Sequence, residues 1–162
     1  MMLSATVLFS ACGDSDNAKN GSADGGGPPG HQLSQEQVDK MLGDLAYDLS
    51  FIGSVGPGDT AALATVLTGA ALSDTQNTIT SELAQGKYKK RIYEDINARL
   101  EVYNYPSAEV FVEFTDKGYY IDPNTQAVLD QPTSERKAYS LSLVQENERW
   151  KINGIYLPST SQ

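Results

Sequence analysis

The side chains that most often do chemistry in proteins, the cysteine thiol and the histidine imidazole, each occur once in this sequence, as Cys12 and His31. A single cysteine excludes an intramolecular disulfide and any metal site built from cysteine pairs. His31 lies among glycines and prolines, outside the segment that is expected to fold, so a histidine-centred catalytic site is excluded as well. We predict no metal and no cofactor for this chain.

Phenols and one carboxylate are the remaining candidates for a binding or acid–base site. Tyrosine hydroxyls donate and accept hydrogen bonds, and an aspartate in a pocket can act as an acid or a base. The candidates on stretches expected to face inward are Tyr88, Tyr93, Tyr103, Tyr119, Asp122 and Tyr139. We predict these as pocket or binding residues. We predict no catalytic residue, because no carboxylate interrupts an expected apolar face in the way that raises the pKa of an acid.

Cys12 follows an uncharged apolar run of ten residues, Met2 to Ala11, which no lysine or arginine precedes. Such a run is too short to span a membrane, for which about 20 residues are needed, and it has the length of a signal-peptide core. The stretch from Leu8 to Cys12 resembles the lipobox of bacterial lipoproteins, with Phe9 where leucine is usual. The resemblance implies a signal peptide over residues 1–11 and acyl chains, palmitate among them, on Cys12. The alternative is an ordinary cleaved signal with an incidental cysteine.

The 20 residues at positions 13–32 read GDSDNAKNGSADGGGPPGHQ and contain no Ile, Leu, Val, Phe, Tyr or Trp. A segment of this composition buries too little apolar surface to offset the entropy of ordering it. A flexible chain of that length has a root-mean-square reach of roughly 25 Å. We therefore expect a disordered tether between a lipid-modified Cys12 and one folded domain over residues 33–162, held at the extracytoplasmic face of the cell membrane.

The charge balance is acidic, with 12 Lys and Arg against 21 Asp and Glu and a net charge of −9. Such a balance repels nucleic acid and anionic lipid headgroups, so we expect no nucleic-acid partner. The membrane contact is therefore expected through lipid on Cys12 alone. The 130 residues of the domain are enough to bury a core without a disulfide or a metal.

Helical spacing dominates the first part of the domain. Ser34 and Gln37 form a capping-box pattern, and apolar residues then recur every 3.6 residues as far as Ile52. The same signals predict a second, shorter helix from Asp59 or Thr60 that ends at Gly69, and a third helix from Ser73 to Gly86.

Three aspartates are placed mostly on the opposite face of the first helix: Asp39, Asp44 and Asp48. Asp44 and Asp48 are spaced i, i+4, so the pair could hold a cation. A solvated helix face is the preferred interpretation, because no other ligands lie nearby in the sequence.

After Gly86 the apolar spacing changes to 2, which predicts four or five antiparallel strands. Alternation is clearest over residues 108–115, and the last two strands are expected at 137–145 and 149–157. Four residues form the only cationic cluster, Lys87, Lys89, Lys90 and Arg91. We interpret it as a solvated strand edge; the alternative is a docking patch for an acidic partner. The element order predicts an α+β fold, with N-terminal helices packed on a curved antiparallel sheet.

The last hairpin, an acidic turn followed by Arg149-Trp150-Lys151-Ile152, resembles the closing hairpin of the nuclear-transport-factor-2-like superfamily. Residues 63–155 are similar to the intermembrane-space domain of plastid-division proteins and its bacterial relatives, with matching stretches at 66–73, 88–93 and 149–155. The resemblance implies a cone with a pocket between helix and sheet. The superfamily includes isomerases, cyclases, dehydratases and non-enzymatic binding or dimerisation modules, so the fold does not choose among them.

We expect a non-enzymatic binding or scaffold module for a protein partner or a small ligand. Phe111, Tyr103 and Tyr105 would be its anchors if they are exposed, and a homodimer through the sheet is a further option. The alternative is a small-substrate enzyme of the isomerase, cyclase or dehydratase type that uses Tyr/Asp acid–base chemistry. It requires Asp122 or another carboxylate in the pocket with a raised pKa.

Overall fold

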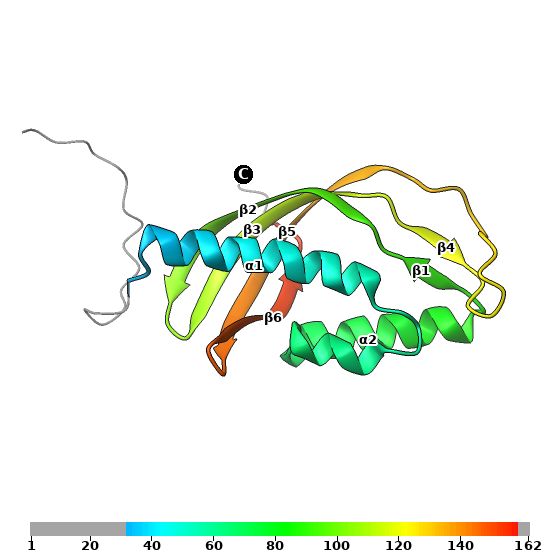
Figure 1. The fold of residues 1–162 in the computed structure, drawn as a ribbon, viewed down its shortest axis with the longest axis horizontal. Helices are drawn as coiled ribbons and strands as arrows, with labels where there is room; N and C mark the ends of the chain where they lie inside the picture. The colour runs from blue at the N-terminus through cyan, green and yellow to red at the C-terminus, as the bar shows by residue number, and fades with distance from the viewer. Residues whose placement is uncertain (1–31, 159–162) are drawn as a thin grey trace, which may run out of the picture.

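The fold of residues 32–158, which a computed structural model describes, is α+β, with helices on one face of a curved antiparallel sheet (Figure 1). This confirms the predicted fold class. Cys12, the expected signal peptide and residues 13–31 of the expected tether lie outside the described residues. Between residues 32 and 158, no helix is long and apolar enough to cross a membrane.

The first helix, α1 (Gln35–Ser54), begins at the predicted capping box. The Gln37 backbone N–H donates to Ser34 Oγ at 3.3 Å, and the Ser34 N–H donates to Gln37 Oε1 at 2.8 Å. These two bonds satisfy donors that the first helical turn leaves free. The predicted apolar stripe of α1 is buried, with Met41, Leu45 and Leu49 each at most 5 % exposed.

The second and third predicted helices are a 3-10 helix, η1 (Thr60–Thr65), and a long helix, α2 (Gly69–Ala84). The prediction that α2 begins at Ser73 is wrong, because the chain just before it docks on the last strand, β6 (Arg149–Tyr156). The Ile152 N–H donates to the Val66 carbonyl at 3.0 Å, and the Thr68 N–H donates to the Ile152 carbonyl at 2.9 Å.

Gly69, which the sequence predicted as a helix end, instead begins α2. Its φ is +51°, a value that L residues rarely adopt, and a Cβ there would lie 2.1 Å from Asn153 Oδ1. Glycine is therefore required at position 69, where the segment that is hydrogen-bonded to β6 ends and α2 begins.

The main sheet has four strands in the order β2-β3-β5-β6, all antiparallel. The first three are β2 (Tyr93–Asn104), β3 (Ser107–Asp116) and β5 (Glu135–Glu146). A second, two-stranded sheet pairs β1 (Tyr88–Lys90) with β4 (Tyr119–Ile121), so the described strands exceed the four or five predicted. The predicted alternation on β3 is confirmed, since Ala108, Val110, Val112 and Phe114 are all buried.

Two helices cover the concave face of the main sheet (Figure 1). α1 lies against β2, and α2 lies against β6 and β1. The core fills the space between these layers, and Leu63, Val110 and Val112 in it have no exposed surface. Every layer also contributes side chains to one pocket, described next.

Candidate functional site

A pocket of about 310 Å³, here called the inner pocket, lies between the two helices and the concave face of the main sheet. Its apolar lining comes from Leu49 and Ile52 on α1, Val112 and Phe114 on β3, and Leu141 on β5. Its volume falls at the lower end of the range for small-ligand pockets, and a mostly apolar wall with a few polar groups is typical of them.

An aromatic row forms one wall of the inner pocket and includes two of the predicted site residues. The Tyr93 ring lies 4.6 Å from the Phe114 ring between centroids, and the Tyr139 ring stacks on the other side at 5.8 Å. Burial raises the pKa of Tyr93 to about 12. The Tyr93 hydroxyl therefore keeps its proton at neutral pH and can donate a hydrogen bond to a bound molecule.

A buried carboxylate, Asp116, stands at the polar end of the pocket and is only 6 % exposed. Its Oδ2 lies 2.8 Å from Lys89 Nζ and 3.2 Å from Lys137 Nζ, and its Oδ1 accepts the Gly118 N–H at 2.8 Å. Burial by itself raises the pKa of Asp116, but the hydrogen bonds from Lys89, Gly118 and Lys137 outweigh it and lower the pKa overall. The carboxylate is therefore ionised at neutral pH.

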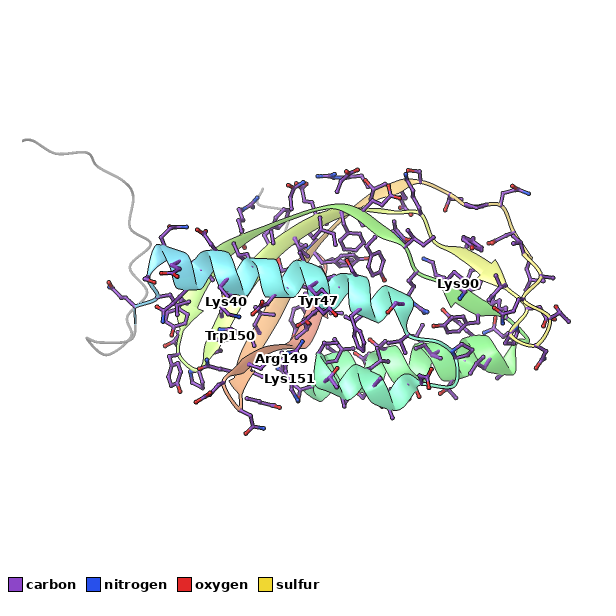
Figure 2. The ribbon with its side chains drawn as sticks, in the orientation of Figure 1. Lys40, Tyr47, Lys90, Arg149, Trp150 and Lys151 are labelled. Carbon is purple, nitrogen blue, oxygen red and sulfur yellow. The ribbon has the colours of Figure 1, made fainter. Side chains whose placement is uncertain are left out.

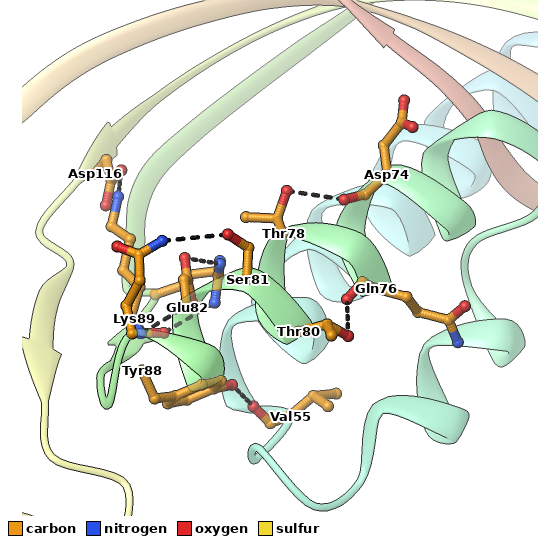
Figure 3. Close-up of polar contacts among 12 residues, drawn as sticks. Val55, Asp74, Gln76, Thr78, Thr80, Ser81, Glu82, Tyr88, Lys89 and Asp116 are labelled. Carbon is orange, nitrogen blue, oxygen red and sulfur yellow. Dashed lines mark hydrogen bonds and ion pairs between the residues drawn. The ribbon is translucent and has the colours of Figure 1, made fainter.

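A second buried ion pair supports this end of the pocket from α2. Arg91 Nη2 lies 2.7 Å from Glu82 Oε1, and the Lys89 N–H donates to Glu82 Oε2 at 3.1 Å (Figure 3). Glu82 is 6 % exposed. The prediction of a solvated strand edge is therefore wrong for Lys89 and Arg91, because buried carboxylates on two other elements turn them inward.

Three of the predicted tyrosines lie outside the inner pocket. Tyr88 is 2 % exposed, and its hydroxyl donates to the Val55 carbonyl, so it joins β1 to the end of α1 (Figure 3). Tyr103 packs edge-on against Trp150 at 6.1 Å, and Tyr119 is half-buried on β4.

The possible anchors on the sheet differ in exposure. Tyr105 is 48 % exposed, whereas Phe111 is half-buried under the Arg99 guanidinium, which lies 4.0 Å from its ring centre. Tyr103 is half-buried as well. Only Tyr105 among these three therefore has the exposure that an anchor needs.

Asp122 is not a pocket acid, contrary to its prediction as a site residue. Its Oδ1 accepts the backbone N–H groups of Asn124 at 2.8 Å and Thr125 at 2.9 Å, in the turn after β4. The bonds from Thr125 and Asn124 lower the pKa of Asp122. Its role is to fix that turn, as aspartate commonly does.

The buried carboxylate that sequence reasoning missed is Asp48. It was expected on the solvated face of α1, yet it is 3 % exposed, and its Oδ1 lies 2.5 Å from Arg149 Nη2 on β6. Burial raises the pKa of Asp48 more than the hydrogen bond and charge of Arg149 lower it. The expectation that no carboxylate interrupts an apolar face is therefore wrong. Asp48 follows Leu45 by three residues and precedes Ile52 by four, and this spacing could have placed it on the buried face of α1.

A second hollow of about 560 Å³, here called the outer groove, lies between residues 33–48, which include most of α1, and the β5–β6 hairpin. Tyr47, Arg149 and Trp150 line it, as does Asp48 (Figure 2). Asp44 pairs with Lys40 at 2.5 Å and Asp48 pairs with Arg149, so the two carboxylates of the possible cation site belong to separate ion pairs. Among residues 32–158, no group of three or more His, Cys, Asp or Glu side chains could hold a metal ion.

No protein-family model and no curated protein sequence matches the chain. Among solved structures, the intermembrane-space region of the chloroplast protein ARC6 is similar with a TM-score of 0.54 and 13 % identity, over 78 % of this chain and 99 % of that one.

Two further solved structures are similar at lower TM-scores. One is a protein of unknown function with a cystatin-like fold from Nostoc punctiforme, with a TM-score of 0.45 and 12 % identity, over 80 % of this chain and 96 % of that one. The other is the putative transfer protein TraH from the Gram-positive conjugative plasmid pIP501, with a TM-score of 0.49 and 8 % identity, over 80 % of this chain and 99 % of that one. The ARC6 match confirms, at the level of the fold, the predicted likeness to an intermembrane-space domain of a plastid protein: the chain is a small α+β domain similar to the intermembrane-space region of ARC6.

Proposed function

We propose that this chain is a lipid-anchored, extracytoplasmic binding module with a nuclear-transport-factor-2-like cone, and that its inner pocket holds a small ligand. One observation carries the proposal. An apolar pocket of about 310 Å³, with an aromatic row along one wall, ends in polar groups that are fixed by ion pairs. Convergent polar groups in an apolar pocket give a ligand both affinity and orientation.

The charge states of the pocket favour binding over catalysis. The pKa of Asp116 is lowered and that of Tyr93 is raised to about 12, so neither group exchanges protons readily near neutral pH. A general acid or base works best with a pKa close to the operating pH. Asp116 and Tyr93 fit the roles of a fixed acceptor and a fixed donor.

The proposed anchor leaves the pocket accessible. The tether would join the domain at the start of α1, whereas the inner pocket is lined by Leu49 and Ile52 near the other end of that helix. A helix of 20 residues is about 30 Å long. The pocket therefore opens well away from the attachment point.

The anchor is tested by growing the host with labelled palmitate and comparing the wild type with Cys12→Ser. The proposal expects label in the wild-type protein and none in the variant. Equal labelling of both, or labelling of neither, contradicts it.

The pocket is tested by identifying small molecules released from the native, detergent-extracted protein by mass spectrometry. The matched control is Thr78→Trp: Thr78 is exposed and lines the inner pocket, so a large ring at this position is expected to fill the pocket. The proposal expects a molecule in near-stoichiometric amount from the wild type and little from Thr78→Trp. Equal recovery from both proteins, or no molecule from the wild type, contradicts it.

A second candidate function, a small-substrate acid–base enzyme, is favoured by one observation. Asp48 has a raised pKa and lines the outer groove beside Tyr47 and Arg149. The test is to incubate a metabolite extract of the host with the wild type and with Asp48→Asn. Depletion of a compound by the wild type alone would favour the enzyme. The same metabolite composition after incubation with either protein would contradict it.

A further inference from the structure

The polar end of the inner pocket carries a local positive excess although the chain is acidic. The chain carries a net charge of −9, yet the pocket is lined by the cations Lys89, Arg91 and Lys137 against the carboxylates Asp74 and Asp116. Arg91 is balanced by the buried carboxylate of Glu82, which lies 2.7 Å away. Lys89 and Lys137 share one carboxylate, Asp116, so this polar end of the pocket has one positive charge in excess. The remaining carboxylates nearby are exposed to solvent: Asp74 on α2, and Glu135, whose side chain is 68 % exposed and lies 3.4 Å from Lys137.

The two lysines keep hydrogen-bond donors for a further anion. An ammonium group has three N–H donors. Lys89 Nζ uses one of them on Asp116 at 2.8 Å, and Lys137 Nζ has contacts at 3.2 Å to Asp116 and 3.4 Å to Glu135. Their side chains are 24 % and 25 % exposed, and both line the pocket. Spare donors of both lysines are therefore available inside the pocket.

An apolar wall continues directly from this cationic end. Phe114 and Tyr139 stack with their rings 24° apart, and Leu141 extends the wall along β5. A wall of aromatic rings and an aliphatic side chain suits an apolar body.

We infer that the inner pocket takes a small organic monoanion, with a carboxylate or sulfonate head at Lys89 and Lys137 and an apolar body against Phe114 and Tyr139. The inference rests on the proposed binding function and names the class of its ligand. A single negative charge on the ligand matches the one positive charge by which Lys89 and Lys137 exceed Asp116. Charge-assisted hydrogen bonds are also about twice as strong as neutral ones.

Two fluorescent probes with the same aromatic frame test the charge preference. 8-Anilinonaphthalene-1-sulfonate carries one sulfonate, and N-phenyl-1-naphthylamine is its uncharged counterpart. Both are titrated into the full chain carrying Cys12→Ser, which removes the acyl site and the need for detergent. We expect the sulfonate probe to bind roughly tenfold more tightly or better. Equal binding of the two probes, or tighter binding of the neutral one, would overturn the inference.

Substitutions at the polar end separate an anion site from a merely structural ion network. Lys137→Met should weaken the sulfonate probe roughly fivefold and leave the neutral probe unchanged. Lys90→Met is the control: it removes the same charge from β1, one residue after Lys89, and Lys90 does not line the pocket. It should leave both affinities unchanged.

Asp116→Asn should act in the opposite direction. It removes the carboxylate that competes for both lysines, so the sulfonate probe should bind roughly threefold more tightly. A network that only stabilises the fold would give weaker binding of both probes, or no change, in Lys137→Met and Asp116→Asn alike, and that result would overturn the inference. Circular dichroism melts verify that each variant is folded at the titration temperature.

The experiments distinguish an error in the proposed binding function from an error in the inferred class of ligand. If neither probe binds, or if Thr78→Trp leaves both affinities unchanged, the proposed binding function at the inner pocket is wrong. If both probes bind equally and Thr78→Trp blocks both, the pocket stands and the anion inference alone is wrong.

Discussion

Asp48 and Asp116 are two buried carboxylates whose surroundings shift their pKa values in opposite directions. Asp48 is 3 % exposed and Asp116 is 6 % exposed, yet the pKa of Asp48 is raised and that of Asp116 is lowered. Asp48 has one cationic partner, Arg149, whereas Asp116 has Lys89, Lys137 and a backbone N–H. Because burial is nearly the same in both, the number of donors decides the direction in which the pKa of each carboxylate is shifted.

The outer groove beside Asp48 and the inner pocket beside Asp116 also differ in their balance of charged side chains. In the outer groove, the carboxylates of Asp44, Asp48 and Glu148 outnumber the cations of Lys40 and Arg149. The polar end of the inner pocket has the opposite excess, because two lysines share Asp116, and the pocket also has the aromatic row. The comparison therefore assigns the organic anion to the inner pocket.

The largest expected effect follows from removing the single partner of Asp48. Arg149→Met leaves a buried carboxylate without its cation, so we expect a loss of about 3 kcal/mol in the free energy of unfolding at pH 7. Urea unfolding measures it. The double variant Asp48→Asn/Arg149→Met should recover most of the loss, and a double variant as unstable as the single one would contradict the assignment.

Replacing the carboxylate by an amide should lower the free energy of unfolding more at Asp116 than at Asp48. Asp116→Asn leaves two lysines facing each other without an anion, and we expect a loss of about 2 kcal/mol. Asp48→Asn removes a poorly solvated charge and should cost less than about 1 kcal/mol. The same urea experiment compares them, and the reverse order would break the contrast.

A smaller effect is expected from removing one of the two lysines. Lys137→Met should cost about 1 kcal/mol, because Lys89 and the Gly118 N–H still hold Asp116. Lys90→Met should change stability by less than about 0.5 kcal/mol, since surface substitutions rarely do more. Equal losses from the two variants would show that Lys137 contributes nothing specific to the network.

The pH dependence of stability should differ in sign between the two carboxylates. The folded pKa of Asp48 lies above its ordinary value of 3.8, so its contribution to stability grows as pH falls from that folded pKa toward 3.8. The folded pKa of Asp116 lies below 3.8, so its contribution is complete above 3.8 and is lost as pH falls through the folded pKa.

Urea midpoints between pH 3 and pH 7 measure these contributions for the wild type, Asp48→Asn and Asp116→Asn. As pH falls, the wild type should gain stability relative to Asp48→Asn and lose its advantage over Asp116→Asn. Differences that move in the same direction for both variants would contradict the opposite pKa shifts.

Local signals in the sequence were sufficient for the elements that depend on neighbours in the chain. The capping box at Ser34 and the alternation on β3 predicted α1 and β3 correctly, because caps and pleated strands are local structures. The start of α2 was missed because it depends on Thr68 and Gly69 docking on β6, about 80 residues later in the chain.

The site was predicted only in part, for the same reason. Tyr93 and Tyr139 do line the inner pocket, but an inward-facing tyrosine such as Tyr88 can equally fill the core. Lys89 turns inward because Asp116 and Glu82 come from β3 and α2, and spacing within β1 cannot reveal them. The lipid on Cys12 stays a prediction.

The measurement that tests the binding account most directly is a ¹⁵N–¹H spectrum of the full chain carrying Cys12→Ser during titration with 8-anilinonaphthalene-1-sulfonate. If the probe binds in the inner pocket, the largest shifts are expected at the backbone amides of Thr78, Phe114 and Tyr139, which line it. Largest shifts at Tyr47 and Trp150, which line the outer groove, would contradict the binding account.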